Sequence, residues 1–175
     1  IDSVAFMPIA SFSSAITTYV GQNFGAGRLD RVKAGVRATQ FMSAAICVVI
    51  SVCVFLAARP LMTLFTRDAG VIGAGTAVLY RLMPCYVLLS ALFILNSALR
   101  GTGESLLPFI ASFSSFMLTR LPAAYILEHF FGWDQIGWCY GIGWVFGLCV
   151  AVPVWFAGKW KRRLPGKMEN SAPVL

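Results

Sequence analysis

Charged residues are scarce in this sequence. They account for 12% of its 175 residues, whereas hydrophobic residues account for 58% and the mean hydropathy is +0.77. A soluble domain would expose a larger polar surface, and five helices that are apolar on all sides could not be covered by the polar residues of so short a chain. The composition therefore predicts an α-helical protein embedded in a lipid bilayer.

Residue types that perform catalysis or bind metals are also few. The sequence has one histidine, His129, and lacks a nucleophile beside a base, paired carboxylates, and any metal-ligand spacing of His and Glu. The cysteines are odd in number, lie in apolar stretches and form no CxxC pair; they are Cys47, Cys53, Cys85, Cys139 and Cys149. We therefore expect no enzymatic activity, no cofactor, no metal and no disulfide.

An initial methionine, a basic leader and a cleavage site are absent as well. The chain opens with Ile1, Asp2 and Ser3 and enters an apolar stretch at once, which indicates a piece of a longer protein. Its formal net charge is +7, but the basic residues form short clusters beside apolar runs instead of alternating with exposed aromatic residues. This arrangement argues against nucleic acid as a partner and favours signals that orient membrane helices.

Five apolar segments are long enough to cross a bilayer. A hydrocarbon core about 30 Å thick needs about 20 residues of helix, because backbone polar groups have to be satisfied within each segment. Residues 1–161 are therefore expected to form part of an all-α transmembrane lobe, followed by a basic tail at 162–175. The predicted spans are residues 3–24, 38–58, 73–99, 105–127 and 135–158.

The basic residues predict the orientation of these spans, because Lys and Arg are retained on the cytoplasmic side. Most of them fall in alternate connections and in the tail, which predicts a multi-pass plasma membrane protein with a cytoplasmic C-terminus. The external side holds Arg59 and Arg67. The residues expected on the cytoplasmic side are Arg28, Arg31, Lys33, Arg37, Arg100, Lys159, Lys161, Arg162, Arg163 and Lys167.

Proline interrupts four of the five predicted spans. Each proline removes a backbone hydrogen bond and can bend its helix. Two interpretations stay open: membrane helices simply tolerate proline, or these bends shape a cavity and let it open. The hinge candidates are Pro8, Pro84, Pro108, Pro122 and Pro153.

Two glycine-rich helix ends form the most specific motifs. Residues 21–27 read Gly-Gln-Asn-Phe-Gly-Ala-Gly, and residues 99–105 read Leu-Arg-Gly-Thr-Gly-Glu-Ser. A phosphate-binding loop is disfavoured, because no strand precedes the first motif and no Gly-Lys-Ser/Thr follows it. Small residues that tolerate positive φ instead let a helix end tightly against its neighbours. The residues assigned to this structural role are Gly21, Gln22, Asn23, Gly25, Gly27, Gly101 and Gly103.

These motifs resemble those of the MATE (multidrug and toxic compound extrusion) transporters, in which Gly-Gln-Asn-x-Gly-Ala-Gly closes the second helix of a lobe. Residues 64–66 and 120–125 fit the same pattern, and the likeness extends to about residue 161. The resemblance implies helices eight to twelve of a twelve-helix protein whose N-terminal lobe is the missing partner. It also implies export of amphipathic organic compounds by alternating access, driven by a proton or sodium gradient.

Ionisable residues at membrane depth are candidates for function, because a charge in lipid is costly. Arg81 and Arg120 are expected roughly 10 Å from the external ends of adjacent spans, since a helix rises about 1.5 Å per residue. They either face the central cavity or extend to the lipid headgroups, and we expect the second. Together with polar residues of the spans, the substrate-cavity candidates are Tyr19, Arg81, Tyr86, Asn96 and Arg120.

No acidic residue lies in the middle of a predicted span. Because the resemblance implies coupling through membrane carboxylates, no obvious coupling site is expected in this segment. Three alternatives to an exporter stay open: a flippase for lipid-linked saccharides, which would line its cavity with several basic residues, a membrane-embedded enzyme, and a scaffold without transport activity. The upstream sequence would discriminate among them.

Overall fold

The computed structural model describes residues 2–132, 135–158 and 160, and its main elements are helical. In chain order they are α1 (Asp2–Gly25), α2 (Leu29–Thr63), α3 (Ala69–Leu82), the 3-10 helix η1 (Met83–Cys85), α4 (Tyr86–Gly101), α5 (Leu106–Phe113), the π-helix η2 (Ser114–Arg120), α6 (Leu121–Phe131) and α7 (Trp138–Ala157).

Adjoining elements combine into five continuous rods within the described residues. Each rod is long and apolar enough to cross a membrane, which confirms the prediction of an all-α protein with five spans. The rods are Asp2–Gly25, Leu29–Thr63, Ala69–Gly101, Leu106–Phe131 and Trp138–Ala157.

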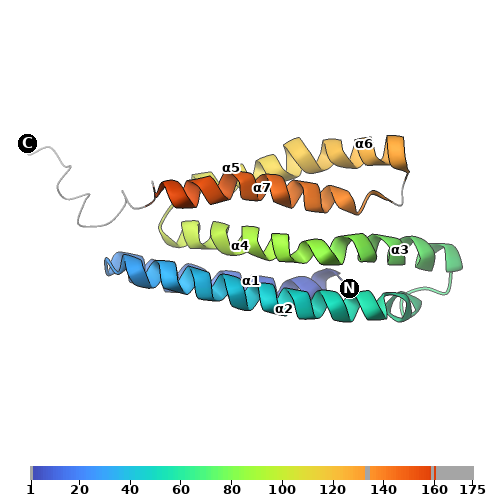
Figure 1. The fold of residues 1–175 in the computed structure, drawn as a ribbon, viewed down its shortest axis with the longest axis horizontal. Helices are drawn as coiled ribbons and strands as arrows, with labels where there is room; N and C mark the ends of the chain where they lie inside the picture. The colour runs from blue at the N-terminus through green and yellow to red at the C-terminus, as the bar shows by residue number, and fades with distance from the viewer. Residues whose placement is uncertain (1, 133–134, 159, 161–175) are drawn as a thin grey trace, which may run out of the picture.

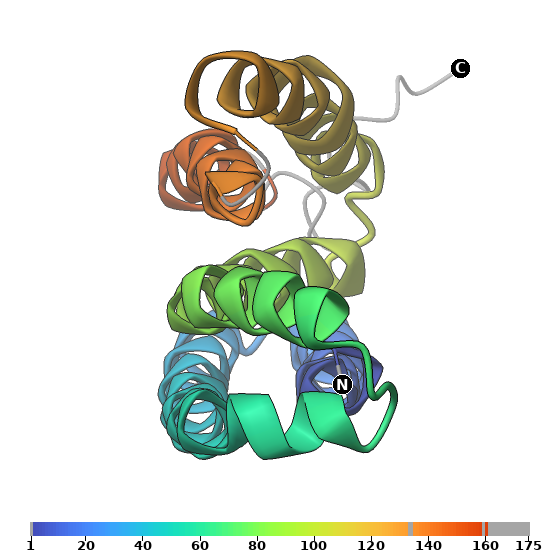
Figure 2. The same cartoon turned by 90° about the vertical axis from the view of Figure 1, so that its right-hand side faces the viewer.

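The rods run side by side in alternating directions. Figure 1 shows α1 and α2 in one layer, α3 and α4 in the next, and α5, α6 and α7 in the third. In the end-on view of Figure 2, α4 lies in the centre, with α2 and α7 on one side and α1 and α5 on the other. Helix α4 contacts α1, α2, α5 and α7, so it joins the two outer layers.

The second rod is longer than its predicted span at residues 38–58. Helix α2 begins at Leu29 and ends at Thr63, so Arg31, Lys33 and Arg37 lie on its first turns instead of in a loop. A hydropathy pattern detects only the part of a helix that crosses the hydrocarbon, whereas Lys, Arg and Ala favour continuation of the helix beyond it. The basic cluster therefore has helical spacing.

Two of the prolines coincide with a departure from α-helical geometry. Pro84 lies in η1, where the buried Ser51 hydroxyl donates a 2.7 Å hydrogen bond to the carbonyl of Met83. Pro122 follows the π-helical segment η2. Proline cannot donate the backbone hydrogen bond that continues an α-helix, and a local change of helix type can accommodate this loss. Both prolines therefore lie at a change of helix type.

The other three hinge candidates do not break a helix. Pro8 lies inside the uninterrupted α1 and Pro153 inside the uninterrupted α7, while Pro108 lies in the first turns of α5. The role of Pro8 and Pro153 as hinges stays a prediction, because a bend does not require a helix to end. A single lost backbone hydrogen bond does not end a membrane helix, because the remaining bonds cannot be exchanged for water.

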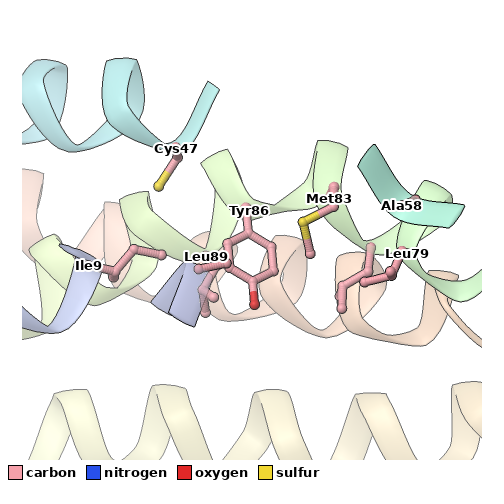
Figure 3. Packing of buried hydrophobic residues seen from close by; sticks show 9 residues of the cluster. Ile9, Cys47, Ala58, Leu79, Met83, Tyr86 and Leu89 are labelled. Carbon is pink, nitrogen blue, oxygen red and sulfur yellow. The ribbon is translucent and has the colours of Figure 1, made fainter. Parts of the chain in front are cut away.

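Buried side chains form two clusters along the bundle. One cluster joins α1, α2, α3 and α4 and contains Ile9, Cys47, Met83 and Tyr86 (Figure 3). The second joins the glycine-rich ends of the helices and is made by Ile16, Val20, Phe24, Val32, Val36, Ile94, Ala98, Leu99 and Trp160. Together they hold α1 and α2 against α4.

The glycine-rich motifs end two helices in the same way. Gly27 has φ +70° and Gly103 has φ +81°, and each follows the last residues of its helix by one or two positions. The next amide, from Arg28 or Glu104, donates to a carbonyl five residues earlier. This hydrogen bond beyond a left-handed residue is typical of the Schellman motif, which favours glycine at the left-handed position.

Candidate functional site

A groove of about 360 Å³ opens between α1, α4, the rod containing α5 and η2, and α7. Aromatic rings form most of its wall, with one guanidinium, one carboxylate and hydroxyl groups among them. We call it the aromatic groove. It is lined by Asp2, Phe6, Tyr86, Leu89, Leu92, Phe93, Ser112, Ser115, Phe116, Arg120, Tyr140 and Trp144.

Arg120 is half-buried at this groove. The central carbon of its guanidinium lies 3.6 Å from the ring centroid of Tyr140 and 5.1 Å from that of Phe116. A guanidinium held over an aromatic ring is attracted by the negative face of the ring. The guanidinium of Arg120 thus packs against two rings of the bundle, and its reach to the lipid headgroups stays a prediction.

Tyr86 brings α1 and α4 together at the same groove. Its ring is buried, and its hydroxyl donates a hydrogen bond to the carboxylate of Asp2. The ring centroid lies 5.9 Å from that of Trp144 in an edge-to-face arrangement, and Trp144 makes a similar contact with Tyr140. The rings of α4 and α7 thus form one connected aromatic wall.

Small residues of α7 permit the close approach of η2. A Cβ added at Gly143 would lie 3.2 Å from the carbonyl oxygen of Ser115, and one at Gly147 would lie 2.8 Å from a methyl of Leu92. The Ser115 hydroxyl also donates a 2.5 Å hydrogen bond to the carbonyl of Gly143. This Gly-x-x-x-Gly face therefore packs against η2 and positions Arg120 above Tyr140.

The remaining predicted cavity residues do not line the aromatic groove, although Asn96 bonds to Ser112, which does. Asn96 is buried, and its side-chain amide donates to the Ser112 hydroxyl at 3.3 Å. Arg81 donates to the Gln135 side chain at 3.1 Å and to a carbonyl of its own helix at 2.9 Å. Tyr19 is exposed and donates to the carbonyl of Arg31 at 3.4 Å. The structure brings together Tyr86 and Arg120 and leaves the other three elsewhere.

Most of the groove was not predicted from the sequence. The rings of Phe6, Phe93, Phe116 and Trp144 belong to apolar spans, where an aromatic residue facing lipid and one facing a groove have the same pattern. A weak signal existed in α7, where the glycines at 143 and 147 indicated close packing. It did not reveal which helix would pack there.

Five apolar rods, four of which line one groove, define a multi-pass helical membrane protein. The chain belongs to the MatE family, whose model matches residues 1–126. Members of this family are transporters, and the membership supports the prediction that the chain is not an enzyme. No solved structure matches the chain significantly.

Two curated relatives, both described as probable multidrug resistance proteins, agree with this assignment. The probable multidrug resistance protein NorM of Thermotoga maritima is 30% identical over 165 residues, which are 93% of this chain and 36% of the relative. The probable multidrug resistance protein YpnP of Bacillus subtilis is 26% identical over 92% of this chain and 36% of the relative. The chain thus spans about a third of the length of these relatives.

Proposed function

We propose that the full-length protein containing this chain exports amphipathic organic compounds, and that this chain supplies helices eight to twelve in its C-terminal lobe. Family membership and the names of the relatives support the proposal at the level of multidrug resistance. The observation that carries it is the aromatic groove, because flat aromatic walls with few polar groups suit ligands that are large, apolar and weakly polar at one end.

Helices α1 and α2 expose surfaces of different chemistry. The exposed face of α1 carries Ser11, Ser14, Thr18 and Gln22 at helical spacing. The exposed face of α2 is apolar and includes Phe41, Met42, Ile46, Val48, Val49, Val52, Phe55 and Leu56. A polar helix face is costly against lipid. We therefore infer that α1 faces the water-filled path or the missing lobe, whereas α2 faces the bilayer.

Residues of α1 line the aromatic groove, whereas its described lining includes no residue of α2. Figure 2 shows α1 and α2 on different sides of the bundle. Alternating access then requires the groove to meet the N-terminal lobe and to open to either side as the two lobes rock. The changes of helix type at Pro84 and Pro122 lie in two of the rods that line the groove and would absorb such movement.

A proton or sodium gradient is the proposed energy source. Within the described residues, no group of three or more His, Cys, Asp and Glu side chains is arranged to hold an ion. The sequence also has no acidic residue in the middle of a predicted span, so the proposal places the coupling carboxylate in a part of the protein outside this chain. The proposed location is the plasma membrane, with the ends near Arg28 and Arg100 in the cytoplasm.

The charges of the aromatic groove favour an exporter over a saccharide-lipid flippase. Among the described residues that line it, Arg120 is basic and Asp2 is acidic, so the opposite charges offset each other. A cavity for a diphosphate-linked saccharide would carry several basic side chains to bind the phosphates. One stacked arginine beside a carboxylate does not fit that requirement.

Ethidium export by the full-length protein provides the test. Phe116 lies half-exposed in the groove and Phe41 is 78% exposed on α2, so Phe116→Leu and Phe41→Leu remove the same ring from two surfaces. An aromatic contact contributes about 0.5–1.5 kcal/mol, so Phe116→Leu should weaken ethidium binding by about 2- to 10-fold. Phe41→Leu should bind and export ethidium like the wild type. Equal behaviour of both variants at equal abundance would contradict the proposal.

A further inference from the structure

A second hollow lies on the opposite side of the bundle from the aromatic groove. It is formed between the first turns of α2 and the last turns of α7, which Figure 2 shows on the same side of α4. Its volume is about 410 Å³. We call it the basic hollow, and it is lined by Lys33, Val36, Arg37, Trp155, Phe156 and Trp160.

Two cations share one face of the helix at this hollow. Lys33 and Arg37 are four residues apart on α2, so their side chains project from adjacent turns in the same direction. Both are exposed. Two positive charges this close repel each other weakly in water and more strongly at a membrane surface, and an anion between them removes the repulsion.

The opposite wall is a fixed tryptophan pair. The Trp160 indole donates a 3.0 Å hydrogen bond to the carbonyl of Trp155, and the two rings stack with centroids 4.8 Å apart. Trp160 is 2% exposed and also contacts Phe24 of α1. Tryptophan prefers the headgroup level of a bilayer, so this pair marks the depth of the hollow.

An apolar groove continues from the basic hollow along the helices. It shares Val36, Arg37, Trp155 and Phe156 with the hollow and adds Gln40, Phe41, Ala44 and Leu95, which lie further from the helix ends. A polar, cationic end followed by an apolar channel has the chemical order of a phospholipid. The channel lies on the same α2 face that we assign to the bilayer.

The half-buried Gln40 lies at the junction of the two parts. Gln40 is three residues after Arg37, so it lies about 4.5 Å deeper along the helix axis. That is the depth at which the glycerol region of a lipid would lie if its phosphate met Lys33 and Arg37.

We propose that the basic hollow and its apolar channel bind one anionic phospholipid. Lys33 and Arg37 hold the phosphate, Trp155 and Trp160 flank the headgroup, Gln40 lies at the level of the glycerol region, and an acyl chain lies on Phe41, Ala44 and Leu95. Basic pockets between membrane helices at the headgroup level bind anionic lipids in this way. The inference does not depend on the transport activity proposed above.

Native mass spectrometry of the purified full-length protein tests this site. The protein is mixed with equal amounts of phosphatidylglycerol and phosphatidylcholine, and each bound lipid is counted. Lys33→Gln/Arg37→Gln should weaken phosphatidylglycerol binding about 30-fold. This factor corresponds to about 1 kcal/mol for each of the two basic side chains near a membrane surface. Arg28→Gln/Arg31→Gln is the matched control, because it removes the same charge from the same helix end outside the hollow.

Two more arms separate a lipid from a free anion and a binding defect from misfolding. Ala44→Phe fills the channel without changing its charge. This variant should therefore bind less phosphatidylglycerol, while inorganic phosphate should compete with the remaining lipid as it does in the wild type. Lys33→Arg keeps the charge and should bind like the wild type. Equal loss in the two double variants would mean diffuse surface attraction and would overturn the proposal. Undiminished phosphatidylglycerol binding by Ala44→Phe, together with inorganic phosphate that competes as strongly as lipid does, would overturn it too.

Discussion

Gly101→Ala is predicted to destabilise the contact between α1 and α4. A Cβ added at Gly101 would lie 2.7 Å from the carbonyl oxygen of Thr17 and 2.8 Å from the Cβ of Val20. Ordinary contacts begin at 3.4 Å, so the helices would have to separate by about 0.7 Å. The obstructing atoms belong to backbone and to a branched side chain, and neither can rotate away.

The expected loss of stability follows from this overlap. Overpacking of a filled interior costs about 1–3 kcal/mol, and exchanging Gly for Ala in a helix recovers up to about 1 kcal/mol. The net loss is therefore up to about 3 kcal/mol. The melting midpoint of the full-length protein should fall, by at most about 2–4 °C for each kcal/mol, because the shift becomes smaller as a protein becomes longer.

Gly25→Ala is the matched control for this measurement. Gly25 ends α1 as Gly101 ends α4, it belongs to the other glycine-rich motif, and an added Cβ would meet nothing within 4 Å. Melting of the full-length variants in detergent, followed by the loss of the monodisperse size-exclusion peak, gives both midpoints. A Gly101→Ala protein that melts with Gly25→Ala, at or above the wild type, would refute the close approach of α1 and α4.

Three further changes test other parts of the molecule. Arg120→Lys should lower ethidium binding about 2- to 5-fold, because an ammonium does not lie flat on the Tyr140 ring. Tyr140→Phe keeps the ring and should bind ethidium normally. Equal ethidium binding by both variants would exclude a role for the stacking. An impermeant maleimide should label a cysteine at Arg67 from outside intact cells and miss one at Arg31, and the reverse pattern would invert the topology. Glu104→Gln should leave ion-coupled export unchanged, because its side chain accepts a backbone hydrogen bond that an amide oxygen also accepts; lost coupling at normal abundance would assign the coupling site to this chain.

Local features of the structure could be predicted because their causes are local. Hydrophobic length determines whether a segment can span a bilayer, and it correctly predicted the five rods. Positive φ is favourable for glycine, and both Gly27 and Gly103 have it at a helix end. Proline was less informative, since the same residue type leaves α1 continuous at Pro8 and accompanies a 3-10 turn at Pro84. The difference depends on what the neighbouring helix offers, and Ser51 is one such partner.

The sequence by itself determined the class of fold, the number of spans and the family, because these depend on composition, segment length and motifs that each lie in one stretch of chain. Only the tertiary structure decided which side chains meet. Tyr86 reaches Asp2 across 84 positions of chain, and Arg120 lies on Tyr140 of the next rod. Both the buried and the exposed faces of a helix such as α2 are apolar, so hydropathy does not specify which face meets a neighbour. The glycines of α7 specify the face that meets η2, because a small residue there lets η2 come near enough to place Arg120 in the groove.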